Sequence, residues 1–142
     1  MNSPEIAAAY DAVRSDKDAI NWLLVADVPG TKKLGLSKTG SGGLAELVDE
    51  LQDDQVQYAY VRQEYANDSE STRVKFALVI WIGQNTKIMR KARVSIESGE
   101  VKKVLSHHSI QVDADARSDL NEKDIVARLR KAGGADYNGG RG

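Results

Sequence analysis

The segment from Phe76 to Ile82 is the longest uninterrupted apolar run in the chain, and it constrains the fold more than any other feature. It is far shorter than the roughly 20 residues that a membrane-spanning helix needs. Gly83 follows it directly. A strand that is apolar on both faces has to be covered on both sides. The sequence therefore predicts a central inner strand over 74–82, in a sheet with other layers packed on each face.

The rest of the chain predicts helices and strands interspersed around this strand. Apolar residues at helical spacing predict helices over 4–14, 44–51, 86–96, 101–105 and 125–132. Alternating residues or short apolar runs predict strands over 20–26, 31–38, 56–65 and 110–114. Ser98 and Gly99 are expected to interrupt the third helix, and Gly133 is expected to end the last one. The fold class is therefore α/β (α+β), with a five-stranded mixed sheet flanked by helices on both faces. We expect one domain over 1–135 and a flexible tail over 136–142.

Alternation along the inner strand divides its side chains between two layers. One layer should receive Phe76, Leu78, Ile80 and Ile82, and the other Lys75, Ala77, Val79 and Trp81. We expect Trp22 to lie on a neighbouring inner strand, with both indole rings buried.

Residues suited to catalysis or to metal binding are sparse. The chain has no cysteine, and its two histidines, His107 and His108, are adjacent and so cannot share one helical face. The Gly35–Gly40 stretch has the spacing of a phosphate-binding loop, but Ser41 stands where such a loop needs its lysine. We therefore expect a cytoplasmic monomer that is not an enzyme, holds no cofactor or metal, and does not insert into a membrane.

Charge is distributed unevenly along the chain. The net charge is −1, but residues 71–103 carry eight Lys or Arg against two acids. Such a segment can offer a basic face to an acidic partner. Nucleic acid is not expected, because the aromatic residues of this segment, Phe76 and Trp81, belong to the apolar strand and cannot stack on bases. A protein or a phosphorylated lipid head group remains as the partner.

Two groups of basic residues are candidates for that face. Lys75 has to project from the end of the inner strand, and Arg73 lies two residues earlier on the same side. Lys87, Arg90 and Lys91 are spaced i, i+3, i+4, which predicts one exposed helical face. Met89, Ala92 and Ile96 are expected toward the core or its border, where a methionine also suits an adaptable contact surface.

Three stretches of the sequence resemble a known family. They are AAYDAVRSDKDAINW (8–22), KFALVIWIGQNTKIMRKARV (75–94) and RLRKAGGADY (128–137). Together they are similar to the actin-depolymerising-factor homology (ADF/cofilin-like) domain family, and within it to the coactosin group. The resemblance implies an ADF-homology (gelsolin-like) fold. It also implies actin binding at the cytoskeleton, with a preference for filamentous actin and without strong severing.

The resemblance also implies which residues contact actin. Lys75, directly before Phe76, matches the family's filament-contacting lysine, and the segment 87–93 matches its long-helix contacts. The expected actin-binding set is therefore Arg73, Lys75, Lys87, Met89, Arg90, Lys91 and Arg93. Ser3 fits two roles, a helix cap or a regulatory serine of the kind that kinases modify in depolymerising members. The alternative function is a protein- or phosphoinositide-binding adaptor that uses the same basic face.

Overall fold

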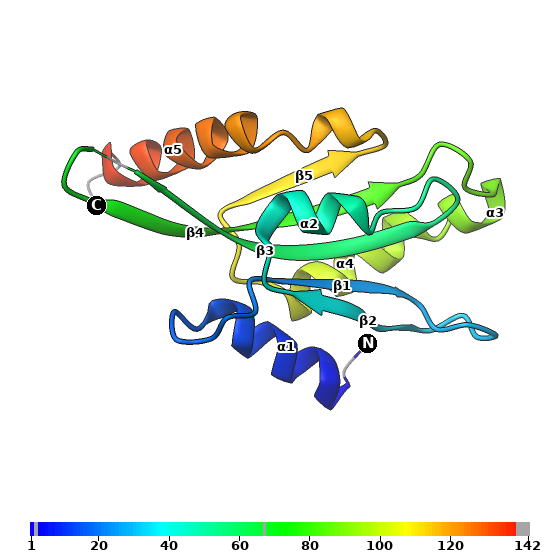
Figure 1. Ribbon diagram of the computed structural model, residues 1–142. Helices are drawn as coiled ribbons and strands as arrows, with labels where there is room; N and C mark the ends of the chain where they lie inside the picture. Colours follow the sequence, from blue (N-terminus) through cyan, green and yellow to red (C-terminus); the bar gives the residue numbers. More distant parts are fainter. Residues whose placement is uncertain (2, 67, 139–142) are drawn as a thin grey trace.

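A five-stranded sheet in the order β2-β1-β3-β4-β5 forms the centre of the molecule (Figure 1). The structure, a computed structural model, describes residues 1, 3–66 and 68–138, with side chains described up to residue 132. The strands are β1 (Trp22–Asp27), β2 (Leu34–Gly40), β3 (Val56–Ala66), β4 (Thr72–Ile82) and β5 (Ile110–Ala114). Neighbouring strands are antiparallel except for β4 and β5, which are parallel. The predicted five-stranded mixed sheet is confirmed.

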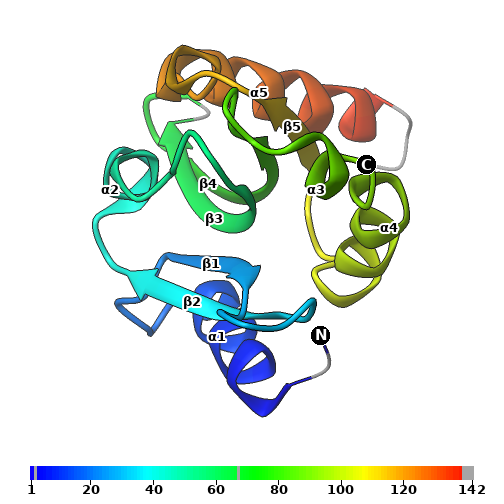
Figure 2. The same cartoon turned by 90° about the vertical axis from the view of Figure 1, so that its right-hand side faces the viewer.

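Helices cover both faces of the sheet (Figure 2). They are α1 (Pro4–Arg14), α2 (Gly43–Asp49), α3 (Ile88–Lys91), α4 (Val94–Val104) and α5 (Glu122–Asn138), with a short 3-10 turn, η1 (Arg117–Asp119), before the last. Helices α1 and α4 pack on one face, and α2 and α5 pack on the other. In the described residues, no helix is both long enough and apolar enough to span a membrane.

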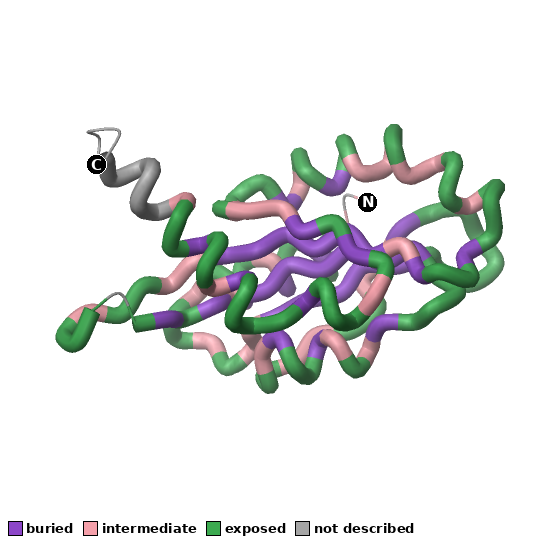
Figure 3. Tube along the Cα trace, turned by 90° about the horizontal axis from the view of Figure 1, so that it is seen from above, coloured by how far each residue is buried: buried purple, intermediate pink, exposed green. Residues whose placement is uncertain are grey.

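Two apolar clusters fill the space between the sheet and its helices, and the buried residues concentrate along the strands (Figure 3). Ala77, Val79 and Trp81 of β4 lie in the cluster under α2 and α5, whereas Phe76 and Leu78 lie in the cluster under α1 and α4. The predicted division of β4 between two layers is therefore confirmed.

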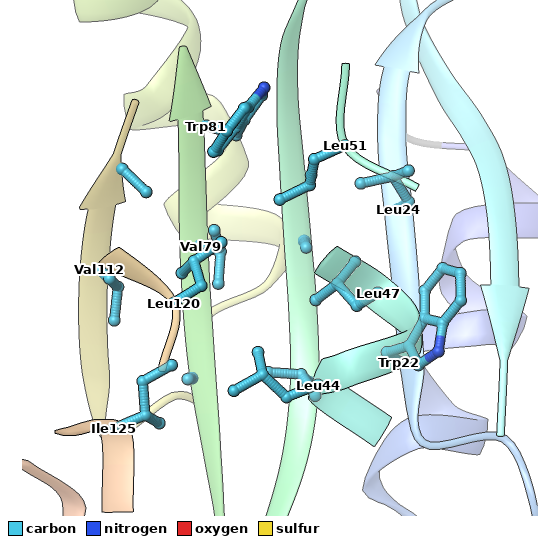
Figure 4. Packing of buried hydrophobic residues seen from close by; sticks show 14 of the residues in the cluster. Trp22, Leu24, Leu44, Leu47, Leu51, Val79, Trp81, Val112, Leu120 and Ile125 are labelled. Carbon is cyan, nitrogen blue, oxygen red and sulfur yellow. The ribbon is translucent and has the colours of Figure 1, made fainter. Parts of the chain in front are cut away.

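The two tryptophans are buried in one cluster but do not lie on neighbouring strands. Trp22 and Trp81 are both fully buried under α2 and α5 (Figure 4). The strand β3 separates β1 from β4, so the expectation that they are neighbours was wrong. Because β1 pairs antiparallel with both β2 and β3, no edge of it is left for β4.

The middle strand of the sheet is β3 rather than β4. Both glutamines of β3, Gln57 and Gln63, are buried at this central position. Gln57 accepts a hydrogen bond from the backbone N–H of Gln52 at 2.8 Å, and the Gln63 amide donates to the Glu64 carbonyl at 2.9 Å. These bonds offset the cost of burying the amides, so a strand with polar residues can occupy the centre.

The helical segment after β4 breaks earlier than expected. The break lies between α3 and α4, at residues 92 and 93, and α4 continues through Ser98 and Gly99. A glycine inside a helix costs about 1 kcal/mol relative to alanine. Burial of Val101 against the sheet outweighs that cost. The expected interruption at Ser98 and Gly99 was therefore wrong.

Helix α5 begins three residues before the predicted 125–132 and ends later. The Asn121 side chain accepts hydrogen bonds from the backbone N–H groups of Lys123 at 2.9 Å and Asp124 at 3.3 Å, which caps the helix. The helix continues past Gly133, so the predicted end was wrong and residues 136–138 of the expected tail are helical. Residues 139–142 lie outside the described residues.

Candidate functional site

A basic patch lies where β4 begins, close to the far end of α5 (Figure 1). Lys75 is opposite Gln63 of β3, and Arg73 is opposite Tyr65. Alternation places these side chains on the α5 side of the sheet, as for Ala77. Arg73 is exposed and Lys75 half-buried, and neither forms an ion pair with any other described residue.

Arg130 of α5 belongs to the same patch, although the sequence did not single it out. Its guanidinium donates to the Ala66 carbonyl at 2.8 Å and lies 5.6 Å from the centre of the Tyr65 ring. Since Tyr65 is opposite Arg73, the two arginines flank one aromatic side chain. The only sequence signal for Arg130 was its place in the family-like stretch 128–137. We call Arg73, Lys75 and Arg130 the strand-end patch.

The turn between β3 and β4 is organised by the carboxylate of Asp68. This group accepts hydrogen bonds from the N–H groups of Glu70 at 2.8 Å and Ser71 at 2.9 Å, and from the Ser71 hydroxyl at 3.0 Å. These bonds, helped by the charge of Arg73, hold the pKa of Asp68 below its usual range. The turn beside the strand-end patch therefore carries a carboxylate that stays charged at neutral pH.

At the other end of β4, three large apolar side chains are exposed. Ile88 and Met89 of α3 are each 82% exposed, and Ile96 of α4 is 84% exposed. Single exposed apolar residues are ordinary, but three large ones on two consecutive helices make this end of the fold a candidate interaction surface. Lys87 and Lys91 are exposed beside them. We call Lys87, Ile88, Met89, Lys91 and Ile96 the helix-end patch.

The expectation that Met89, Ala92 and Ile96 point toward the core was wrong, because all three are exposed. The α3 segment lies beyond the end of β4, so it has no sheet beneath it to cover (Figure 1). Only further along α4, from Val94 to Val104, do side chains reach the core. Apart from Val94, the apolar residues of 88–96 therefore face outward.

Arg90, expected on the exposed helical face, and Arg93, expected only among the actin contacts, both belong to an ion network. The Arg90 side chain is 12% exposed and donates to Asp27 at 2.8 Å and to Glu97 at 2.6 Å. Arg93 contacts the same two carboxylates at 3.3 and 3.6 Å. Both arginines therefore join the end of β1 to α3 and α4, and the exposed cations beside α3 are Lys87 and Lys91.

The network also reaches the middle strand. The Tyr58 hydroxyl donates to Glu97 at 2.8 Å, and burial, with a smaller effect of the Glu97 charge, raises the pKa of Tyr58. Burial opposes the charge on Arg90, but its hydrogen bonds to Asp27 and Glu97 outweigh that effect and raise its pKa. Tyr58 therefore stays protonated and Arg90 stays charged at neutral pH, as their hydrogen bonds require.

Ser3 caps α1, as one of its two expected roles requires. Its hydroxyl oxygen accepts a hydrogen bond from the Ile6 N–H at 3.2 Å, and Pro4 occupies the first helical position. A regulatory role for Ser3 stays a prediction. Within the described part of the chain, no group of three His, Cys, Asp or Glu side chains could hold a metal ion.

The two patches lie at opposite ends of β4. The seven residue steps from Lys75 to Ile82, at about 3.3 Å each, place Lys75 roughly 23 Å from the end of the strand that leads to α3. The basic third of the chain therefore forms two separate surfaces instead of one. One is basic throughout, and the other has an apolar centre beside lysines.

The scaffold therefore belongs to a class of protein with a candidate binding surface at each end of one inner strand. The chain belongs to the family of cofilin/tropomyosin-type actin-binding proteins, whose family model matches residues 1–130. It is a family of actin-binding proteins and not of enzymes, in agreement with the expectation from the sequence.

Three relatives make the comparison more specific. Coactosin from Dictyostelium discoideum is 39% identical over 142 residues, which cover 99% of this chain and 96% of that protein. The crystal structure of coactosin from Entamoeba histolytica matches with a TM-score of 0.83 at 32% identity, covering 89% of this chain and 92% of that one. Mouse coactosin, described as an actin filament binding protein, matches with a TM-score of 0.74 at 30% identity over 95% and 92% of the two chains. The predicted ADF-homology fold and the resemblance to coactosin are confirmed.

Proposed function

We propose that this chain binds actin filaments through the strand-end and helix-end patches and regulates filament dynamics without strong severing. The observation that carries the proposal is the pair of patches at opposite ends of one strand. A partner built from repeated subunits can meet both patches at once, each on a neighbouring subunit. The family match supports actin as that partner, and the mouse relative described as a filament-binding protein supports the filament.

A rigid link between the patches explains a preference for filaments over monomeric actin. Once one patch is bound, the second contact becomes intramolecular and benefits from a high effective concentration. The strand β4 supplies the rigidity, because it is paired with β3 along its whole length and with β5 over residues 77–81. A single actin subunit would meet only one patch and would therefore bind more weakly.

The chemistry of each patch suits a protein partner. The helix-end patch has exposed Ile88, Met89 and Ile96 with lysines beside them, which resembles the apolar core and polar rim of a protein interface. The lysines would guide the chain toward an acidic surface and would chiefly affect the association rate and its dependence on salt.

Such a protein works at the actin cytoskeleton of the cytoplasm. The alternative of an adaptor that uses the same basic face is not favoured, because the family match points to actin. Binding of phosphoinositide head groups and a monomeric state stay predictions. Sedimentation with vesicles that contain a phosphoinositide, and light scattering of the free chain, check them.

Co-sedimentation with actin filaments at low and high salt tests the proposal. Lys75→Ala should weaken binding by about 2 kcal/mol, or about thirtyfold, if the ammonium group pairs with a carboxylate at a desolvated contact. The free energy of unfolding should change by no more than ~0.5 kcal/mol. Lys102→Ala is the matched control, since this exposed lysine of α4 belongs to neither patch. Equal sedimentation of the two variants at low salt would show that Lys75 is not a specific contact.

A further inference from the structure

We propose that the turn between β1 and β2, residues 28–33, is a third actin-contacting element that extends the helix-end patch. This inference rests on the proposed function and adds Val28, Lys32 and Lys33 to the binding surface. None of these residues lies in the basic segment 71–103 or in the stretches that resemble the family.

Exposed apolar residues point to this turn. Across the described ranges, the exposed large hydrophobic residues are Val28, Ile88, Met89 and Ile96. Three of them belong to the helix-end patch, and the fourth is Val28, which is 41% exposed. The turn lies at the same end of the molecule as α3 (Figures 1 and 2). All four therefore lie at one end of the fold.

The turn is joined to α3 by ionic contacts. Asp27 directly precedes Val28, and its carboxylate accepts hydrogen bonds from Arg90 at 2.8 Å and from Arg93 at 3.3 Å. The Arg90 side chain is only 12% exposed, so the contact with the more exposed Asp27 is fixed from the α3 side. The position of the turn relative to the helix-end patch is therefore set within the free protein.

The turn itself is held by several hydrogen bonds. The Val28 N–H donates to the Lys33 carbonyl at 2.8 Å, and the Val28 carbonyl accepts from the Thr31 N–H at 3.0 Å and the Thr31 hydroxyl at 2.9 Å. Gly30 has a φ of 78°, which the turn requires and other residues adopt at a cost. A Cβ at Gly35 would lie 2.6 Å from a methyl group of Val28, so Val28 packs directly over this glycine. A turn ordered before binding loses little conformational entropy on association.

The turn carries exposed lysines, as the helix-end patch does. Lys32 and Lys33 are exposed, as Lys87 and Lys91 are. None of these four lysines forms an ion pair with another described residue. Arg90 and Arg93 are neutralised by their carboxylate partners and offer little charge to a ligand. The surface at this end is therefore four apolar side chains with four lysines, which suits an acidic protein surface with an apolar contact point.

The test compares two double variants that remove the same charge. Lys32→Ala/Lys33→Ala should weaken co-sedimentation with actin filaments about fivefold at low salt and less at high salt, as expected for two rim lysines. Lys102→Ala/Lys103→Ala, on the exposed side of α4, should bind as the unaltered chain does. Thermal unfolding should be unchanged in both, because all four lysines are exposed. Equal affinities of the two double variants would overturn the inference.

A spectroscopic measurement adds a readout of contact. The chain contains no cysteine, so a cysteine introduced by Lys33→Cys can carry a single solvent-sensitive fluorophore. Its emission should shift to the blue when filaments saturate the protein, and the same label at Lys103→Cys should not shift. An unshifted Lys33 label on a fully bound chain would also overturn the inference. Failure of the unaltered chain to sediment with filaments would instead overturn the proposed function.

Discussion

Replacing Ile88 and Met89 together by glutamine should remove most filament binding while leaving the fold intact. Both side chains are 82% exposed, so the free energy of unfolding should change by no more than ~0.5 kcal/mol. Glutamine is a good helix former, so the substituted α3 segment keeps its preference for a helical conformation. The variant therefore changes the apolar character of the surface and little else.

The expected magnitude follows from the exposed fractions. Burying a whole isoleucine or methionine side chain contributes about 1.5–3 kcal/mol, and nearly all of that is still available at both positions in the free protein. Taking the lower value for each, the double substitution should weaken binding by about 3 kcal/mol, or more than about a hundredfold in Kd.

Co-sedimentation with filaments at two salt concentrations measures this effect. The deficit of the Ile88→Gln/Met89→Gln variant should persist at high salt because the lost contact is apolar, whereas a deficit from a lost lysine should shrink. Ala127→Gln, an exposed position of α5 outside both patches, is the control. Unchanged affinity of the double variant would refute the assignment of the helix-end patch. A loss of several kcal/mol in folding stability would show that these side chains support the fold instead.

Three further predictions concern the core. Trp81→Ala should lower the free energy of unfolding by about 3–5 kcal/mol, measured by denaturant titration, because a fully buried indole leaves a cavity; an unchanged midpoint would contradict its burial. Gly83→Ala should cost about 1–3 kcal/mol in the same assay, since its Cβ would lie 2.3 Å from the backbone of Asp53. Burial raises the pKa of Tyr58 and Tyr60, so their stabilising effect is complete below the unfolded pKa of about 10 and is lost as pH rises above it. Tyrosinate absorbance of these two residues should therefore appear only together with unfolding in an alkaline titration.

Local patterns predicted the layers of the sheet well. The alternation from Phe76 to Trp81 assigned each side chain to its correct face because the strand has two covered sides and a period of two. The helix start at Ser3 and Pro4 was also read correctly, since a cap involves residues only a few positions apart. These features depend on near neighbours in the sequence, which is why the sequence alone could specify them.

The organisation of the candidate site was harder to predict. Apolar spacing around Met89 indicates a buried face, but it does not say whether the chain's own core or a partner covers that face. Arg90 looked exposed because its carboxylate partner Asp27 lies 63 positions away in the sequence. The sequence around Arg90 therefore does not predict its contact with Asp27. The pairing of β1 with β3 and the packing of α4 bring Arg90 and Asp27 together.

The strand β4 sets the separation between the two ends of the molecule that carry the patches. The strand is paired with β3 along its whole length and with β5 over residues 77–81, so it neither stretches nor bends easily and holds its two ends at a nearly constant separation. Under the proposed function, the two patches would therefore contact the filament at a fixed separation. A filament whose subunits are spaced or twisted differently would engage one patch and miss the other. Affinity would then report the geometry of the filament as well as the chemistry of its surface.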